Sequence, residues 1–378
     1  MSKLNLIIKP TDFCNMRCKY CYNSYSEYNK KVLPHEDLKK MLTIVAKAYD
    51  EIVIIWHGGE PSSVGLEYYE RAMEIEKAIS FEFGTKFDNR MQSNGTLFDE
   101  KWAVFIKENG FKVGLSFDGI HNDTYRGCTD KTLATMELFK KHGIRFPCMA
   151  VVVDGDYDLI ANYEFFKEKR VPIEFSHMIP EGAGKNLKQL SAEQYADATI
   201  KLFDHWLYDL EGVSVRSFVS YINLALGGPS LICNYSSCHG KYLCINSDGS
   251  LYNCSRQSIH EYCLGNISEV SSVEEIFASD GFKKVLIGSI KRRNKCKESC
   301  EFFTLCQGGC ADVAICEGAL DTPPEYSCYI FGKVFTYIKN TLAELFEKKV
   351  SLATLNPFVR EAIIKCLGVK EDYTISPK

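Results

Sequence analysis

Three cysteines near the start of the chain have a spacing that suits metal binding. Cys14, Cys18 and Cys21 follow the pattern C-x3-C-x2-C within the segment T-D-F-C-N-M-R-C-K-Y-C-Y. Three thiolates on one short loop can hold three corners of a cubane iron–sulfur cluster. The fourth iron then stays free to bind substrate, as an open metal site does. Zinc is the alternative, but it would want a fourth ligand nearby, and the nearest histidine is His35.

The 17 cysteines in 378 residues are not expected to form disulfides. Their density is far below that of small disulfide scaffolds, and a chain of this length can bury its own core. The N-terminal apolar run is too short for a signal peptide, and no run approaches the about 18 apolar residues of a membrane span. We therefore expect a cytoplasmic protein with no membrane contact. The net charge of −4, without a basic stripe, predicts no nucleic-acid partner.

Short apolar runs alternate with segments of helical period in the first half of the chain. Predicted strands cover residues 4–9, 52–56, 87–92, 112–117, 146–152 and 173–178. Leu38, Met41, Leu42, Val45 and Tyr49 share one face of a predicted helix, and Asp99 is a suitable N-cap for another helix. Six strands, each followed by a helix, predict an α/β fold with a parallel sheet and right-handed crossovers.

Three segments are expected. Residues 1–229 should form a partial (β/α)6 barrel, because a full eight-unit barrel needs roughly 250 residues; an open doubly wound sheet is the alternative. Residues 230–330 are expected to be rich in loops and hold most of the later cysteines, with one hairpin formed by residues 242–245 and 251–253. Residues 331–378 should be helical and pack the second domain onto the first.

The cysteine loop after the first strand resembles the radical S-adenosylmethionine (SAM) superfamily. The string W-H-G-G-E-P at the end of the second predicted strand matches the G-G-E-P motif of that superfamily, and further motifs end the third and fourth strands. A parallel α/β barrel places its active site at these strand ends. The resemblance implies a SAM site formed by Tyr20, Gly58, Gly59, Glu60, Pro61, Ser93, Asn94, Ser116, Asp118 and Arg126.

The same resemblance implies roles for these residues. Glu60 would hold the methionine amino group, Ser116 the ribose and Arg126 the SAM carboxylate, for which a planar guanidinium is suited. Tyr20 would border the adenine. The reduced cluster would cleave SAM to methionine and a 5′-deoxyadenosyl radical, which abstracts a hydrogen atom from the substrate.

The later cysteines resemble the SPASM domain, which binds two auxiliary 4Fe-4S clusters. The chain has C-x3-C-x5-C-x3-C where the domain usually has x2 in the first interval, so Cys296 is the ligand that departs from the pattern. Zinc is again the alternative, and Cys233 or Cys316 could replace a ligand. The resemblance implies an inner cluster on Cys238, Cys244, Cys254 and Cys310 and an outer cluster on Cys296, Cys300, Cys306 and Cys328.

With three 4Fe-4S clusters and SAM, the chain is expected to be a radical SAM oxidoreductase that modifies a peptide. Its opening resembles the anaerobic sulfatase-maturating enzymes, but Ser255 stands where they carry an aspartate base, and His57 stands where they carry glutamine. We therefore expect a thioether, carbon–carbon or ether cross-link in a ribosomally made peptide, with formylglycine formation as the alternative. An electron carrier or scaffold and a small-molecule dehydrogenase are further alternatives.

Candidate bases near the predicted strand ends are His57, His177 and Glu181, since a group of this kind could take the substrate proton. A strand-end histidine can equally be structural. The expected partners are a peptide substrate and a low-potential electron donor such as flavodoxin or ferredoxin.

Overall fold

The computed structural model describes residues 2–23, 30–236, 238–256 and 259–370. Its strands form one nine-stranded sheet in the order β6-β5-β4-β3-β2-β1-β7-β8-β9. The first seven strands in this order are parallel, and β8 and β9 continue the sheet as antiparallel strands. The strands are β1 (Lys3–Ile8), β2 (Glu51–Trp56), β3 (Lys86–Ser93), β4 (Lys112–Ser116), β5 (Cys148–Val152), β6 (Ile173–His177), β7 (Tyr242–Ile245), β8 (Ser250–Tyr252) and β9 (Gly265–Asn266).

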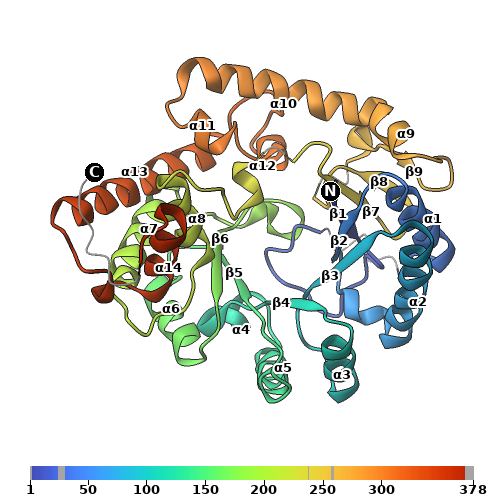
Figure 1. The fold of residues 1–378 in the computed structure, drawn as a ribbon, viewed down its shortest axis with the longest axis horizontal. Coiled ribbons are helices and arrows are strands. Elements are labelled where there is room, and N and C mark those ends of the chain that lie inside the picture. The colour runs from blue at the N-terminus through green and yellow to red at the C-terminus, as the bar shows by residue number, and fades with distance from the viewer. Residues whose placement is uncertain (1, 24–29, 237, 257–258, 371–378) are drawn as a thin grey trace.

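Helices of the first domain lie outside the arc of strands, and the C-terminal domain covers one end of the molecule (Figure 1). Within the described part of the chain, no helix is long and apolar enough to cross a membrane. The helices are α1 (His35–Ala46), α2 (Leu66–Phe83), α3 (Glu100–Glu108), α4 (Asn122–Tyr125), α5 (Thr129–Lys141), α6 (Leu159–Glu168), α7 (Ala192–Leu207), α8 (Arg216–Ala225), α9 (Val273–Ala278), α10 (Asp280–Ser299), α11 (Phe303–Cys306), α12 (Ala311–Cys316), α13 (Glu325–Glu347) and α14 (Pro357–Leu367).

The predicted partial (β/α)6 barrel is confirmed, and the sheet does not close. Each of the six predicted strands agrees with the structure to within two residues. Local signals work as expected: Leu38, Met41, Leu42 and Val45 are buried on α1, and the Asp99 side chain accepts the Trp102 N–H at the start of α3. Apolar periodicity therefore determined both the strands and the helix faces.

The two domains share the sheet through β1. This strand pairs in parallel with β2 on one side and with β7 of the predicted hairpin on the other. Helix α13 packs against α7 and α8, as expected for a helix that holds the second domain against the first. Its start at Glu325 places Cys328 within its first turn.

Residues 230–330 are rich in loops, as expected, but they also contain α10, which runs for 20 residues and was not anticipated from the sequence. Its buried face carries Phe282, Val285, Ser289, Arg292 and Cys296, spaced three or four residues apart as a helix requires. Two of these five, Ser289 and Arg292, are not typical core residues, so the helical period is partly hidden in the sequence. Their burial indicates that α10 covers the cysteine sites described below.

Candidate active site

The loop with the first three cysteines lies against two glycines that follow β2. Gly59 N–H donates to Thr11 O at 3.1 Å, and the next residue, Glu60, donates its N–H to Phe13 O at 2.7 Å. A Cβ on Gly59 would lie 2.2 Å from Phe13 O, and Gly58 has a φ of +117°. Only glycine permits this close approach of the two chain segments. The G-G-E-P segment therefore fixes the cysteine loop at the end of the barrel.

The thiols of this loop are close enough to influence one another. Burial, followed by the nearby charges of Glu60, Cys18 and Cys21, raises the pKa of Cys14 to about 12. Burial also raises the pKa of Cys18 and Cys21, while the positive charge of Arg126 acts in the opposite direction on both. Iron would displace these thiol protons, since metal ligands bind as thiolates. Three converging thiols of one loop fit three corners of a 4Fe-4S cluster.

Glu60 joins the ends of β2 and β3. Its carboxylate accepts the Ser62 N–H (3.0 Å), the Ser62 hydroxyl (2.6 Å), the Ser93 hydroxyl (2.7 Å) and the Asn94 N–H (2.7 Å). Burial raises the pKa of Glu60, and these hydrogen bonds lower it. Asn94 also donates from its amide to Asn15 in the cysteine loop at 2.9 Å. Ser93 and Asn94 are thus brought to the first cysteines, as the SAM-site prediction requires.

Tyr20, Asp118 and Arg126 form one buried network. The Tyr20 hydroxyl donates to both Asp118 oxygens, at 2.7 and 2.9 Å, and accepts a hydrogen bond from Arg126 Nη1 at 2.9 Å. Asp118 also accepts the Val151 N–H at 3.0 Å. Ser116 is the last residue of β4, two positions before Asp118, and its hydroxyl accepts a hydrogen bond from Gln92 of β3 at 2.8 Å. The structure therefore gathers the predicted SAM residues of β4 beside the cysteine loop.

The four predicted thiols of the outer cluster lie together. The Cys328 thiol is influenced, after burial, by Cys306, Cys296 and Cys300, and its pKa is raised to about 12. Cys296 is likewise influenced by Cys306 and Cys300. Helix α10 supplies Cys296, and α13 supplies Cys328. The extra residue after Cys296 is accommodated because Cys296 sits in the last turn of a helix.

The predicted inner site contains Cys233, which the sequence indicated only as a possible replacement for one of the assigned ligands. After burial and Asp312, the nearest charges that raise the pKa of Cys310 are those of Cys233 and Cys238. Cys233 is also the first charge acting on Cys238, and Cys254 lies near Cys310. Cys233, Cys238, Cys254 and Cys310 therefore converge.

Cys244 lies on β7, apart from most of the other thiols of the predicted inner cluster. It is fully buried and packs against Ile7 and Tyr252. The charged groups that act on its pKa are Lys9 and Asp12, and its own charge raises the pKa of Cys254. The spacing C-x4-C of Cys233 and Cys238 was the available signal for this alternative set.

Arg256 bridges two carboxylates beside the inner site. It is two residues beyond Cys254, and its Nη2 lies 2.9 Å from Glu181 Oε2 while its Nε lies 3.0 Å from Asp312 Oδ2. A carboxylate oxygen from each acid and the Cys316 sulfur lie within 4.8 Å of one another. Burial raises the pKa of Asp312 to about 6, against the lowering effect of Arg256. Asp312 was not singled out from the sequence.

The Glu181 segment reaches the first cysteine loop. Ala183 N–H donates to Cys21 O at 2.8 Å, and a Cβ on Gly182 would lie 2.2 Å from Tyr22 O. Arg256 lies over the Tyr22 ring, 5.9 Å from its centroid. The Glu181–Arg256–Asp312 group therefore lies between the first cysteine loop and the inner auxiliary site.

The two candidate histidines are buried in different places. His57 Nδ1 accepts the Gly58 N–H at 2.8 Å and lies 3.3 Å from the Tyr22 hydroxyl. His177 contacts the rings of Tyr195 and Tyr326, and its Nε2 has no hydrogen-bond partner among the described residues. Burial, followed by nearby cationic side chains, lowers the pKa of both histidines to about 4.

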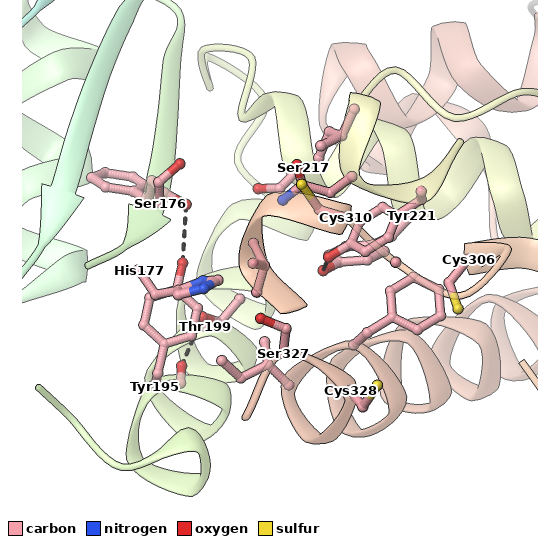
Figure 2. Close-up of a pocket in the computed structure, with 18 of the residues that line it drawn as sticks. Ser176, His177, Tyr195, Thr199, Ser217, Tyr221, Cys306, Cys310, Ser327 and Cys328 are labelled. Carbon is pink, nitrogen blue, oxygen red and sulfur yellow. Dashed lines mark hydrogen bonds between the residues drawn. The ribbon is translucent and has the colours of Figure 1, made fainter. Parts of the chain in front are cut away.

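His177 faces a cavity of about 160 Å³ between the barrel and the C-terminal domain. Figure 2 shows Cys306 and Cys328 on the side opposite His177, with Tyr195 and Tyr221 also in the wall. Cys300 and Cys310 complete the thiol lining. A space lined by thiols of both auxiliary sites fits metal clusters that those thiols would hold.

Comparison with known families agrees with this geometry. Residues 8–158 match the radical SAM superfamily, and residues 233–307 match the SPASM iron–sulfur cluster-binding domain. The second match begins at Cys233. These two matches confirm the cofactors expected from the sequence, which are 4Fe-4S clusters and SAM.

Relatives resemble the chain over nearly its whole length. A cysteine-type anaerobic sulfatase-maturating enzyme of Clostridium perfringens is 33% identical, covering 89% of this chain and 96% of its own. A serine-type enzyme of Bacteroides thetaiotaomicron is 30% identical, with 89% of each chain covered. The solved structure of native anSMEcpe with bound AdoMet and Cp18Cys peptide has a TM-score of 0.77 at 31% identity, covering 90% of this chain and 99% of its own. Streptococcus suis SuiB bound to precursor peptide SuiA shares the fold at 18% identity, with a TM-score of 0.61 and 85% and 74% covered.

We predict that Cys233→Ala removes the inner cluster and that Cys244→Ala leaves it in place. Reconstituted protein should fall from about twelve irons per chain to about eight in the first variant only, because each 4Fe-4S cluster holds four irons. Anaerobic iron and sulfide determination provides the measurement. Cys366→Ala, which removes a half-buried thiol on α14, is the control. Loss of iron in Cys244→Ala with full loading of Cys233→Ala would restore the original ligand assignment.

We predict that Arg126→Gln weakens SAM binding about 10- to 100-fold. A charge-assisted hydrogen bond contributes about 1.5–3 kcal/mol, and about 1.4 kcal/mol corresponds to tenfold in affinity. Equilibrium binding of SAM to the reconstituted protein measures the change. Arg145→Gln removes an exposed arginine and should bind SAM as the unmodified protein does. Equal affinity of both variants would contradict the predicted role of Arg126.

Proposed function

Because the chain belongs to the radical SAM enzymes with a SPASM domain, in the family of the anaerobic sulfatase-maturating enzymes, we propose that it oxidises a cysteine of a sulfatase to formylglycine. The observation that carries this proposal is similarity at 30–33% identity over about nine-tenths of the chain to enzymes of that name. The most similar of the relatives named above is of the cysteine type, and a solved neighbour holds a cysteine peptide.

The expectation of a peptide cross-link is wrong. It gave decisive weight to Ser255 and His57, whereas the whole chain resembles sulfatase-maturating enzymes. The likeness to SuiB, at 18% identity, extends to the fold alone. A modified peptide or protein as substrate remains in agreement with both comparisons.

The proposed conversion turns a –CH2–SH group into –CHO. One hydrogen atom leaves the β-carbon, one proton leaves the sulfur and one electron is removed; water then replaces the sulfur, which departs as hydrogen sulfide. When bound, SAM and the clusters would supply the radical for the hydrogen abstraction and the acceptor for the electron. We expect a flavodoxin or ferredoxin to supply reducing electrons. The chain itself must hold the cysteine and accept its thiol proton.

We propose Glu181 as the group that accepts this proton. It lies between the first cysteine loop and the inner auxiliary site, which is where a substrate that reacts with SAM and passes on an electron has to bind. Arg256 holds its carboxylate in place at 2.9 Å, and Asp312 holds Arg256 from the other side. Glu181, in the loop after β6, would thus accept the thiol proton. Ser255 cannot do so, since a serine hydroxyl is no base at neutral pH.

The two histidines are less suitable as proton acceptors. His57 already accepts a hydrogen bond from Gly58 on Nδ1. With a pKa lowered to about 4, each histidine binds a proton more weakly than an ordinary imidazole. His177 faces the cavity from the side opposite Cys306 and Cys328 of the outer set (Figure 2).

The proposed function is tested with a sulfatase-derived peptide that carries its modifiable cysteine. Under anaerobic conditions with SAM and dithionite, we expect an aldehyde that reacts with a hydrazine, detected by mass spectrometry of the peptide. An otherwise identical alanine peptide and the variant Cys14→Ala should give no aldehyde. A product that retains its sulfur and lacks two hydrogens would contradict the cysteine-type proposal. So would conversion only of a peptide in which serine replaces the modifiable cysteine.

The role of Glu181 is tested by Glu181→Gln. Because general base catalysis contributes about 10²- to 10⁴-fold, formylglycine formation should fall by about 10²-fold or more. Formation of 5′-deoxyadenosine should persist, since this variant leaves the SAM site intact. Ser255→Asp placed in the same variant should restore part of the activity. Glu193→Gln, at the exposed start of α7, is the control; equal activity of the two glutamine variants would refute the assignment.

A further inference from the structure

Arg292 is a buried cation that forms an ion pair with no acidic side chain in the part of the chain that the structure describes. It lies on α10 and is 1% exposed. Its guanidinium donates to three backbone carbonyls, those of Gly308 at 2.8 Å, Gly309 at 3.4 Å and Leu320. Among the described residues, no carboxylate forms an ion pair with it. A buried charge without a counter-charge is strongly unfavourable, so a negative group has to lie nearby.

The position of Arg292 relates it to both auxiliary sites. Gly308 and Gly309 lie in the chain between Cys306 of the outer set and Cys310 of the inner set, and Gly309 N–H also bonds to Cys306 O at 3.0 Å. Cys296 of the outer set follows on the same helix, one turn later. The thiolates whose charge acts on Arg292 are those of Cys310, Cys296 and Cys238, which belong to both sets.

The other titratable side chains near Arg292 supply no negative charge. His239, beside Cys238, is half-buried and carries no negative charge in either of its ordinary protonation states. Arg293, the next residue, is itself a cation. The thiolate-ligated clusters are thus the negative charge that faces Arg292, and a cluster gains a further negative charge when it is reduced.

We propose that Arg292 raises the reduction potentials of the two auxiliary clusters and so prepares them to accept an electron. A positive charge in a site of low dielectric constant stabilises the reduced, more negative form of a cluster over the oxidised form. A guanidinium suits this role because it does not lose its proton in proteins. Arg292 acts through the clusters and is a positioning residue. The inference rests on the auxiliary clusters and not on the identity of the substrate.

The alternative is that Arg292 only clamps the loop between Cys306 and Cys310. Arg292→Gln removes the charge and keeps an amide donor for a carbonyl, whereas Arg292→Lys keeps the charge and loses the three-way hydrogen bonding. A clamp would be impaired in both variants. A charge effect would be lost in Arg292→Gln alone.

The measurement is an anaerobic redox titration of the reconstituted full chain, followed by electron paramagnetic resonance. Signals that do not change when SAM is added belong to the auxiliary clusters. We expect Arg292→Gln to shift their potentials downward, and Arg292→Lys to keep them near those of the unmodified protein. Lys291→Met removes an exposed cation from the same helix and should cause no shift. Iron content of about twelve per chain confirms loading of each variant.

Unchanged potentials in fully loaded Arg292→Gln would overturn the proposal, as would equal downward shifts in the glutamine and lysine variants. If Arg292→Gln does not load its clusters, the lysine variant decides: potentials like those of the unmodified protein support the proposal, and lowered ones overturn it. Because the potentials are read without substrate, absence of formylglycine formation leaves this result unaffected.

Discussion

Parallel pairing of β1 on both of its edges is the constraint from which the site follows. Through β2 the strand meets the G-G-E-P segment, and through β7 it meets the hairpin that leads to the auxiliary cysteines. At its end, Ile8 O accepts the His57 N–H, and Lys9 N–H donates to Ile245 O, both at 2.9 Å. The first cysteine loop therefore leaves the sheet between the SAM motif and the second domain. A slip of one residue would turn every side chain of β1 to the other face and separate these groups.

Charge compensation connects the three cysteine sites. Burial raises thiol pKa values at each of them, which opposes the thiolate form that iron requires. Arg126 acts against this at Cys18 and Cys21, Arg256 lies beside Cys310, and Arg292 lies between the auxiliary sets. Arg126 lies at the end of α4, Arg256 follows Cys254 by two residues, and Arg292 lies on α10, so the positive charge comes from three different parts of the chain. Guanidinium groups serve here because they stay charged when buried.

Much of the fold could be predicted from the sequence, because most of the barrel strands contain short buried apolar runs and the helix faces follow a regular period; β3, with the sequence KFDNRMQS, is the polar exception. Helix α10 could not, since Ser289, Arg292 and Cys296 occupy its inner face. Arg292 is buried because it binds loop carbonyls, and Cys296 because it lies at a predicted cluster site. A hydrophobic pattern does not report such contacts. The choice between Cys233 and Cys244 as a ligand of the inner cluster could not be made from the sequence for a similar reason. Both spacings are compatible with a ligand, and only the pairing of β7 reveals that Cys244 packs against Ile7.

Ser255 shows why a residue's absence at one aligned position is weak grounds for excluding a reaction. Removing a proton requires a base at a given position next to the substrate, and that position can be reached from several elements. Here Glu181 enters from the loop after β6 and Asp312 from α12, and Arg256, one residue beyond Ser255, joins them. Glu181 and Asp312 are 131 positions apart, so their meeting follows from the packing of the second domain on the barrel. The family relationship over the whole chain and the local substitution are therefore compatible, because the chemistry depends on the assembled group of charges and not on one position.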